Sequence, residues 1–105
     1  MTQILLIKPR NRFAKVIEII GQEKHKFRFQ RGNLGQDNSR CTIGLLLSHF
    51  GWTGNNCASS DYDEADDKLH ELISAEEQNF IANINDKCEN YDVVIERLER
   101  AGESH

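Results

Sequence analysis

The chain has 105 residues, of which 38% are apolar and 29% are charged, and its net charge at pH 7 is −4. This length fits a single domain with a modest core, and this composition is typical of a globular protein and not of a disordered one. No apolar run reaches the roughly 18 residues that a membrane-spanning helix needs. The opening "MTQILLIKPRN" lacks the basic lead-in and the small-residue cleavage site of a secretory signal, so we expect a cytoplasmic protein without a membrane partner.

The N-terminal third has the patterns of β-strands. "ILLI" at 4–7 is a short apolar run, and "FAKVIEII" at 13–20 is rich in β-branched residues. "HKFRFQR" at 25–31 alternates phenylalanines with polar residues, which is the period of a half-buried strand. Because "GQEK" at 21–24 supplies a turn, residues 13–31 are predicted to form a β-hairpin.

The remainder of the chain has the pattern of three helices. Between Ser39, a candidate N-cap, and Gly51, a stop signal, apolar residues recur at i, i+3, i+4 and i+7. A second helix begins in the acidic stretch at 60–73. A third, at 75–101, is the longest predicted element, with apolar spacings of three and four. At 1.5 Å per residue it would be about 40 Å long, so we expect it to pack on the two earlier helices or, in part, on a second copy of the chain.

These elements predict an α+β fold in one domain, 1–105. A small, basic, antiparallel hairpin or sheet occupies 1–40, and three helices in the acidic part, 41–105, pack on one of its faces. The predicted core contains the apolar residues that face inward in these patterns, namely Val16, Ile20, Phe27, Phe29, Ile43, Leu46, Leu47, Phe50, Leu69, Leu72, Ile73, Ile81, Ile84, Tyr91 and Leu98.

Five acidic residues lie within seven positions at 61–67, and a calcium loop is one explanation for them. An EF-hand loop that began at Asp61 would need an oxygen ligand at its fifth position, a glycine at its sixth and a glutamate at its twelfth. The chain has Ala65, Asp66 and Leu72 at these positions. A helix start explains the stretch better, because carboxylates at a helix N-terminus cap its free N–H groups and favour the helix dipole.

Capping boxes are predicted at two places. Ser60 with Asp63, or Asp61 with Glu64, fits the spacing at the start of the acidic helix. The "SAEE" at 74–77 fits it again, which indicates a break before the last segment.

Charge is divided unequally along the chain. Residues 1–40 carry nine basic and three acidic side chains, a net of +6, whereas residues 41–105 carry four basic and fourteen acidic side chains, a net of −10. Such asymmetry suggests interaction surfaces of opposite sign.

The favoured hypothesis is a non-enzymatic protein whose acidic helical surface binds and inhibits or regulates a basic protein partner, including one that normally holds nucleic acid. Trp52 is the candidate apolar anchor beside that surface, with a core position as its alternative. The predicted partner-binding residues are Asp61, Asp63, Glu64, Asp66, Asp67, Glu71 and Trp52. In size, acidity and lack of a catalytic signature the chain looks like small inhibitor and regulator proteins of bacterial viruses and mobile elements.

The alternative hypothesis is nucleic-acid binding through the basic hairpin, because cations beside aromatic side chains suit single strands. The candidate contacts are Lys24, Lys26, Arg28 and Arg31. The same alternation that defines the strand places the phenylalanines on the opposite face from Lys26 and Arg28, where they are expected in the core.

Catalytic and metal motifs are weak in this sequence, and no cofactor is predicted. The histidines have no fixed spacing to a serine, cysteine or carboxylate that would specify chemistry. Cys41, His49, Cys57 and Cys88 would supply four zinc ligands in number, but structural zinc sites usually contain two close pairs. We therefore expect reduced thiols that pack as small core residues.

Overall fold

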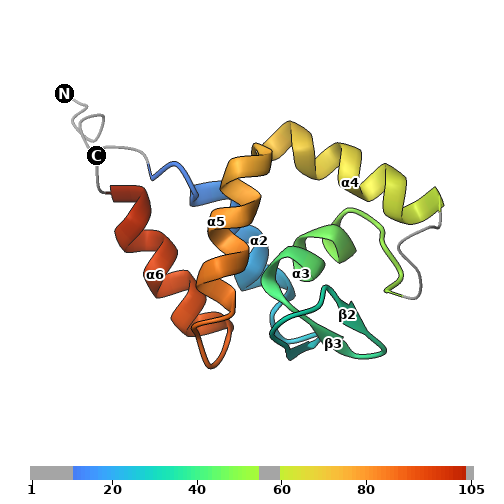
Figure 1. The fold of residues 1–105 in the computed structure, drawn as a ribbon, viewed down its shortest axis with the longest axis horizontal. Helices are drawn as coiled ribbons and strands as arrows, with labels where there is room; N and C mark the ends of the chain where they lie inside the picture. Colours follow the sequence, from blue (N-terminus) through green and yellow to red (C-terminus); the bar gives the residue numbers. More distant parts are fainter. Residues whose placement is uncertain (1–10, 55–59, 104–105) are drawn as a thin grey trace.

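The computed structural model describes residues 11–54 and 60–103, and within them it is mainly helical (Figure 1). The helices are α2 (Ala14–Glu23), α3 (Thr42–His49), α4 (Ser60–Leu72), α5 (Ala75–Asn85) and α6 (Tyr91–Glu103). The strands are β1 (Arg28–Phe29), β2 (Gly35–Gln36) and β3 (Ser39–Arg40). The predicted α+β fold, an antiparallel hairpin followed by three helices, is therefore wrong. None of the described helices is long and apolar enough to cross a membrane.

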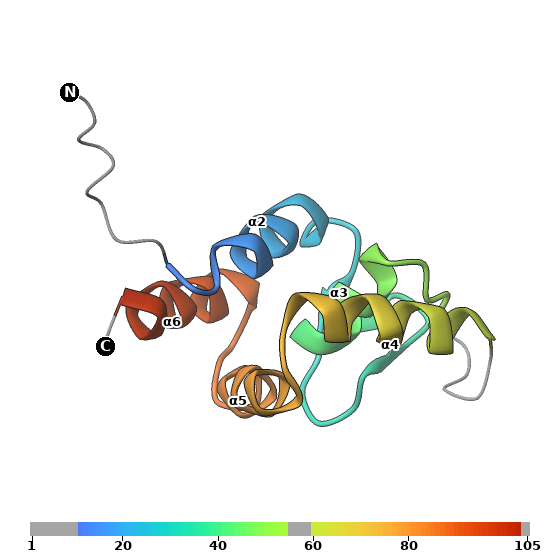
Figure 2. The ribbon, with the colours of Figure 1, turned by 90° about the horizontal axis from the view of Figure 1, so that it is seen from above.

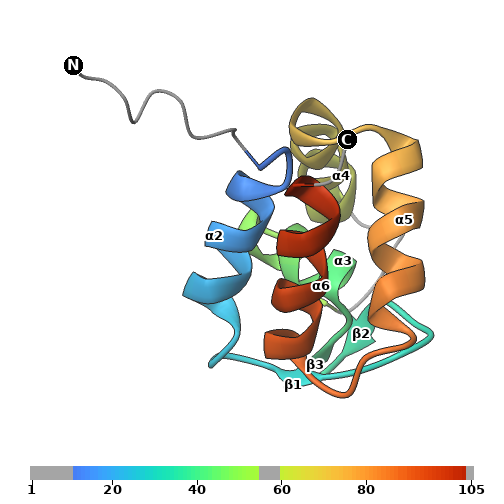
Figure 3. The same cartoon turned by 90° about the vertical axis from the view of Figure 1, so that its left-hand side faces the viewer.

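Helix α3 lies at the centre of the fold and packs against α2, α4 and α5 (Figures 1 and 2). Its six residues from Thr42 to Leu47 are all buried, because helices cover it on several sides. Helix α6 packs between α2 and α5 at one end of the molecule (Figure 3). Helix α4 packs on α3 as an outer helix, so that much of its surface is left uncovered (Figure 2).

The three strands form a small sheet in the order β1-β3-β2. Strand β1 is parallel to β3, with Arg28 opposite Ser39, and β2 is antiparallel to β3, with Gly35 opposite Arg40. The hydroxyl group of Tyr91, on α6, contacts the carbonyl oxygens of Arg28 at 3.0 Å and Arg40 at 2.6 Å. The sheet is thus a short connection between α2 and α3 that α6 holds in place.

The segment 13–20, predicted as a strand, is the start of α2. Phe13, Val16, Ile19 and Ile20 are each at most 1% exposed, and their spacing is that of one helix face. The high β-propensity of isoleucine and valine is only a weak preference, which packing of this face against α3 and α6 outweighs. The predicted turn at 21–24 lies at the C-terminal end of the same helix.

The predicted single helix at 75–101 is two helices. Helix α5 ends at Asn85, and α6 begins at Tyr91 after a short turn. The side chain of Asn90 accepts a hydrogen bond from the N–H of Val93 at 2.9 Å, which caps the start of α6. The apolar positions of the predicted stripe are largely used inside the chain, because α5 packs on α6, so the expected dimer contact along one long helix loses its basis.

Three local predictions are confirmed. Helix α3 lies between Ser39 and Gly51, although Cys41 and not Ser39 is its N-cap. A helix covers the acidic stretch as α4, but Ser60 and Asp61 are its first two helical residues, so neither is the predicted N-cap of a capping box. The capping box at the start of α5 is present, with both of its hydrogen bonds, at 2.8 and 3.1 Å. The predicted strand at 4–7 also lies outside the described residues.

The core resembles the predicted one but extends beyond it. Most predicted residues are buried, and five are only partly so: Phe27, Phe29, Phe50, Leu72 and Ile84. The predicted core omitted the buried residues Phe13, Ile19, Leu45, Ala65 and Val94. The thiols of Cys41 and Cys88 are buried, as expected of small core residues, and Trp52 takes the core position that was its alternative.

Candidate functional site

The outer face of α4 is formed by acidic side chains. Ala65 and Leu69 are fully buried against the rest of the molecule. Glu64, Asp67 and Glu71, at i, i+3 and i+7, point to the opposite side of the helix, and all three are exposed. At 1.5 Å per residue these three side chains span about 10 Å along the helix axis. We call them the α4 acidic stripe, and Asp63 is exposed beside it.

The other two predicted acidic residues of this region have local contacts. A carboxylate oxygen of Asp61 accepts a hydrogen bond from the N–H of Thr53 at 3.1 Å, which joins α4 to the loop that follows α3. The carboxylate of Asp66 lies 3.4 Å from Nδ1 of His70, one turn along the helix. The six acidic residues predicted from the sequence therefore divide into four exposed ones and two with identified contacts.

Trp52 is a core residue, so the exposed-anchor interpretation of it is not supported by its position. Its side chain belongs to the buried cluster, with 4% of the residue exposed. Its ring packs edge-to-face on Tyr62 of α4, with the ring centroids 5.9 Å apart. Trp52 thus helps to hold α4 on the protein.

The four cations of the predicted hairpin do not lie on a hairpin. Lys24 follows α2 and forms an ion pair with Asp92 of α6, and Lys26 forms one with Glu23 at 3.0 Å. Arg28 in β1 and Arg31 in the following loop are exposed. The nucleic-acid alternative therefore loses the arrangement on which it depended.

Arg40 is a buried cation that the charge count treated as part of the basic surface, and it is only 2% exposed. Its Nε donates to Oγ of Ser48 at 2.8 Å. One terminal nitrogen donates to the carbonyl oxygens of Asp37 and Ser39, and the other to that of Thr53. A single guanidinium group thus joins the sheet, the end of α3 and the loop before α4.

Two aromatic rings complete the environment of Arg40. Its guanidinium carbon lies 4.3 Å from the ring centroid of Phe27 and 5.2 Å from that of Trp52. Burial lowers the pKa of Arg40, and the nearby Tyr91 and Asp37 oppose this effect. A Cβ atom at Gly54 would overlap the guanidinium, so the loop can approach it only with a glycine there. This burial could not be predicted from the sequence, because Arg40 meets Ser48, Thr53, Phe27 and Trp52 only in the folded chain.

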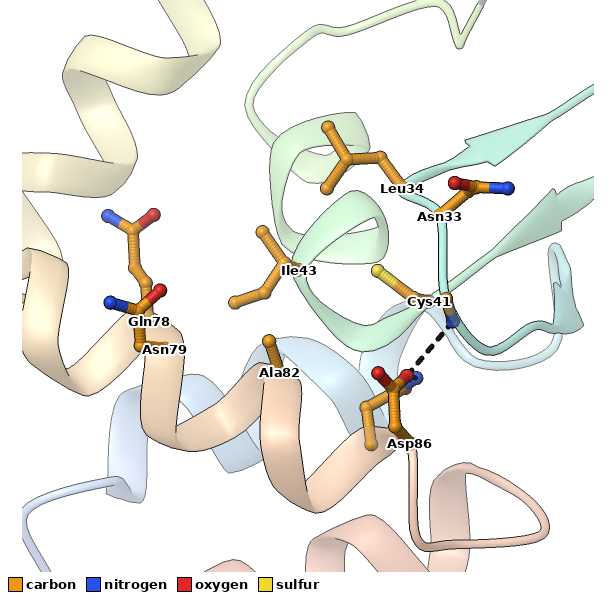
Figure 4. Close-up of a pocket in the computed structure, with 10 residues that line it drawn as sticks. Asn33, Leu34, Cys41, Ile43, Gln78, Asn79, Ala82 and Asp86 are labelled. Carbon is orange, nitrogen blue, oxygen red and sulfur yellow. Dashed lines mark hydrogen bonds between the residues drawn. The ribbon is translucent and has the colours of Figure 1, made fainter.

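A cavity of about 340 Å³ lies between α5, the start of α3 and the loop at 32–34 (Figure 4). Its apolar lining comes from Leu34, Cys41, Ile43 and Ala82. The polar lining consists of amide side chains and one carboxylate, with no basic residue: Asn33, Gln78, Asn79, Asn85 and Asp86. The cavity therefore combines an apolar surface with a net negative charge.

Asp86 supplies the charge of this cavity. It is the C-cap residue of α5, and one carboxylate oxygen accepts hydrogen bonds from the N–H of Gly32 at 2.9 Å and from Nδ2 of Asn85 at 3.3 Å. Asp86 is exposed and forms no ion pair within the described residues. A carboxylate at the negative end of a helix dipole is unfavourable without a cation nearby.

Cys41 lies in the cavity wall as a protonated thiol. Burial raises its pKa, and the negative charge of Asp86 acts in the same direction, although its backbone hydrogen bonds oppose them. The thiol also accepts a hydrogen bond from the N–H of Gly44 at 3.4 Å. A raised pKa disfavours the thiolate, which is the nucleophilic form of cysteine.

A histidine–carboxylate pair joins α2 to α3 away from this cavity. Nδ1 of His49 lies 2.8 Å from Oε2 of Glu23, whose other oxygen bonds Lys26. The hydrogen bond from His49 lowers the pKa of Glu23, and Lys26 contributes to this effect against the opposing effect of burial. Among the described residues no group of three or more histidine, cysteine or acidic side chains is arranged to hold a metal ion, and Cys57 lies outside them.

Comparison with known proteins gives no match to a family model, to a curated protein or to a solved structure.

Proposed function

We propose that the α4 acidic stripe binds a basic surface of a partner protein and thereby inhibits or regulates it. The observation that carries this proposal is the exposure of Glu64, Asp67 and Glu71 on a helix whose opposite face attaches it to the core. None of the three forms an ion pair within the described residues, although Lys68 is on the same helix.

Two acidic residues of α6 provide a contrast within the same chain. Asp92 pairs with Lys24, and Glu96 pairs with Arg100. These two carboxylates have intramolecular cations, whereas those of the α4 acidic stripe form no ion pair with any residue that the structure describes. An uncompensated row of carboxylates attracts a basic surface over long range, which mainly raises the rate of association.

The partner class that fits this stripe is a protein whose basic surface normally holds nucleic acid. Such surfaces present rows of lysine and arginine to a regularly spaced series of phosphates. A row of carboxylates along a helix offers charges of the same sign as these phosphates. Its binding would therefore occupy the basic surface of the partner and block the nucleic acid. Regulation by such blocking needs no catalytic group in the protein that carries α4.

Two variants with equal loss of charge test the proposal. The first carries Glu64→Gln, Asp67→Asn and Glu71→Gln on α4, and the control carries Glu89→Gln, Glu96→Gln and Glu99→Gln in and before α6. Wild-type protein is immobilised, proteins retained from a low-salt cell extract are recovered, and their association rates with all three proteins are measured. We expect the α4 variant to associate about tenfold more slowly or worse, and the control to change much less.

Two outcomes would contradict the proposal. If both variants slowed association equally, the binding would reflect net charge and not the α4 acidic stripe. If the wild-type protein and the α4 variant retained the same proteins, the α4 acidic stripe would be only a solvated helix face.

A further inference from the structure

The cavity beside α5 has a chemistry that matches one side chain, and we infer that it receives an arginine side chain of the bound partner. This inference rests on the proposed function for the source of the arginine. It places the short-range contact of the complex in the cavity and not at Trp52, which is buried.

The charge of the cavity selects a cation. Asp86 is the one ionised group among the lining residues, and no lysine or arginine lines the cavity with it. Both hydrogen bonds that its carboxylate accepts come from neutral donors, the N–H of Gly32 and the amide of Asn85, so its charge is not neutralised. Its place at the C-terminal end of α5 adds the negative end of the helix dipole.

The shape and the apolar lining select a long aliphatic stem. Ile43 and Ala82 face each other across the space between α3 and α5, with Leu34 beside Ile43 (Figure 4). A charged side chain gains stability when its methylene groups cover such a surface while its head reaches a polar group. Arginine fits better than lysine because its planar guanidinium donates in two directions, to the Asp86 carboxylate and to a neighbouring amide oxygen.

Gln78 lies at the other end of α5, and its amide nitrogen does not face the open space of the cavity. Its side chain lines the cavity, and its Nε2 is buried without a hydrogen-bond partner within the described residues. A buried donor without an acceptor costs about 1–3 kcal/mol. Gln78 and Asp86 are eight residues apart on α5, which is about 12 Å. The guanidinium of an arginine side chain would therefore reach Asp86 without a contact to Nε2 of Gln78, because that nitrogen has no surface open to the cavity.

The test uses small probes, so that it does not depend on finding the partner. N-acetyl-arginine amide is titrated into the isotope-labelled protein, and amide chemical shifts are followed by NMR. The neutral isostere N-acetyl-citrulline amide is the ligand control. We expect saturable shifts at the cavity lining with millimolar affinity, and at least tenfold weaker binding of the citrulline compound.

Three variants locate the site and separate it from the α4 acidic stripe. Asp86→Asn keeps the acceptor for Gly32 and should abolish arginine binding, whereas Glu89→Gln, an exposed change three residues away, should leave it unaltered. Ala82→Leu should block binding by filling the cavity while the carboxylate remains. The α4 triple variant should bind the arginine compound like the wild type, so failure of the proposed function would be distinct from failure of this inference.

Equal binding of the citrulline compound, binding that survives Asp86→Asn, or no saturable shift at the cavity would each overturn the inference. Loss of arginine binding in the α4 triple variant would also overturn it, because the recognition would then be a general effect of acidic surface charge.

Discussion

Asn85 is the position at which a change of one atom should test the packing of this fold most directly. The residue is fully buried at the end of α5. Its Oδ1 accepts hydrogen bonds from the backbone N–H of Thr42 at 2.8 Å and from the Thr42 hydroxyl at 2.7 Å. Its Nδ2 donates to the carbonyl oxygen of Gln30 at 3.0 Å and to Asp86 at 3.3 Å. One amide therefore joins α5, the start of α3 and the strand region.

The substitution Asn85→Asp keeps the shape and both bonds to Thr42 but replaces the donor with an oxygen. That oxygen would face the Gln30 carbonyl and the Asp86 carboxylate, so it is repelled by both. An uncompensated buried charge of this kind costs about 3–5 kcal/mol. Because each kcal/mol corresponds to about 4–8 °C in a domain of up to 100 residues, we expect the melting temperature at pH 7 to fall by more than about 12 °C.

The loss should depend on pH with a definite sign. Burial and the neighbouring Asp86 raise the pKa of the introduced carboxyl above its unfolded value of about 3.9. A protonated carboxyl can donate to the Gln30 carbonyl, so the variant regains stability relative to wild type below about pH 4. The difference then increases as the pH rises through the folded-state pKa of the new group.

Urea denaturation of Asn85→Asp, of wild type and of Asn83→Asp, measured from pH 4 to pH 8, checks this expectation. Asn83 is exposed on the same helix, so it controls for an added charge on α5. Equal effects of the two substitutions, or a difference from wild type that does not vary with pH, would show that Asn85 does not make the bonds described.

Four further substitutions test the contacts of single residues. Gly21→Ala, in open space on α2, should raise the free energy of unfolding by about 0.5–1 kcal/mol. Gly44→Ala should lower it instead, because the added Cβ would overlap a backbone carbonyl; similar effects of the two in thermal melts would contradict the packing around α3. Glu23→Gln should lower the free energy of unfolding at neutral pH but not at low pH. The pKa of Glu23 is lowered by its hydrogen bond with His49, so the stability from this contact is present above the ordinary pKa of a glutamate and is lost as the pH falls through the folded-state pKa. Chemical denaturation at neutral and at low pH measures this difference. Arg40→Lys should lower the free energy of unfolding by about 3 kcal/mol, because an ammonium group cannot donate to the same spread of acceptors. Urea denaturation followed by tryptophan fluorescence measures this loss, and a much smaller one would contradict the role given to Arg40.

The parts of the fold that could be predicted are those with local signals. The Ser74 capping box depends on residues three apart, and the helix at Thr42–His49 on apolar spacing within eight residues. The acidic helix start was also local, because carboxylates favour the first turn of whichever helix contains them.

The errors came from interactions between distant segments. Residues 13–20 have strand propensity, yet their period matches a helix as well, and the contact of α2 with α3 and α6 decides between the two. The apolar pattern at 75–101 continues in phase across the turn at 86–90, since both helices face the same core, so its period could not reveal the break. Only Asn90 offered a local hint, as the cap of α6.

The candidate site shows the same division. The number of acidic residues on α4 is a property of the sequence, and their exposure follows from the helix period. The burial of Trp52 and Arg40 could not be predicted from the sequence, because it arises where the loop at 53–54 meets the sheet. The cavity likewise joins α5 to a loop more than forty residues away, which no pattern along the chain could predict.

The α4 acidic stripe should reduce the stability of the helix that carries it. Glu64 with Asp67, and Asp67 with Glu71, are like-charge pairs at i, i+3 and i, i+4, and each costs about 0.2–0.5 kcal/mol. Glu71 also lies in the last turn, where the helix dipole disfavours a negative charge. We therefore expect the α4 triple variant to melt a few degrees above wild type, while it binds the partner more slowly.

A higher melting temperature together with slower binding would distinguish a functional surface from one that stabilises the helix. A local unfavourable arrangement without a compensating contact is expected where binding requires it. The control Glu89→Gln, Glu96→Gln and Glu99→Gln removes the Glu96–Arg100 pair, so its melting temperature should not rise. If thermal melts showed instead that the α4 variant is less stable than wild type, the carboxylates would be supporting the helix, and their exposure would no longer argue for a partner.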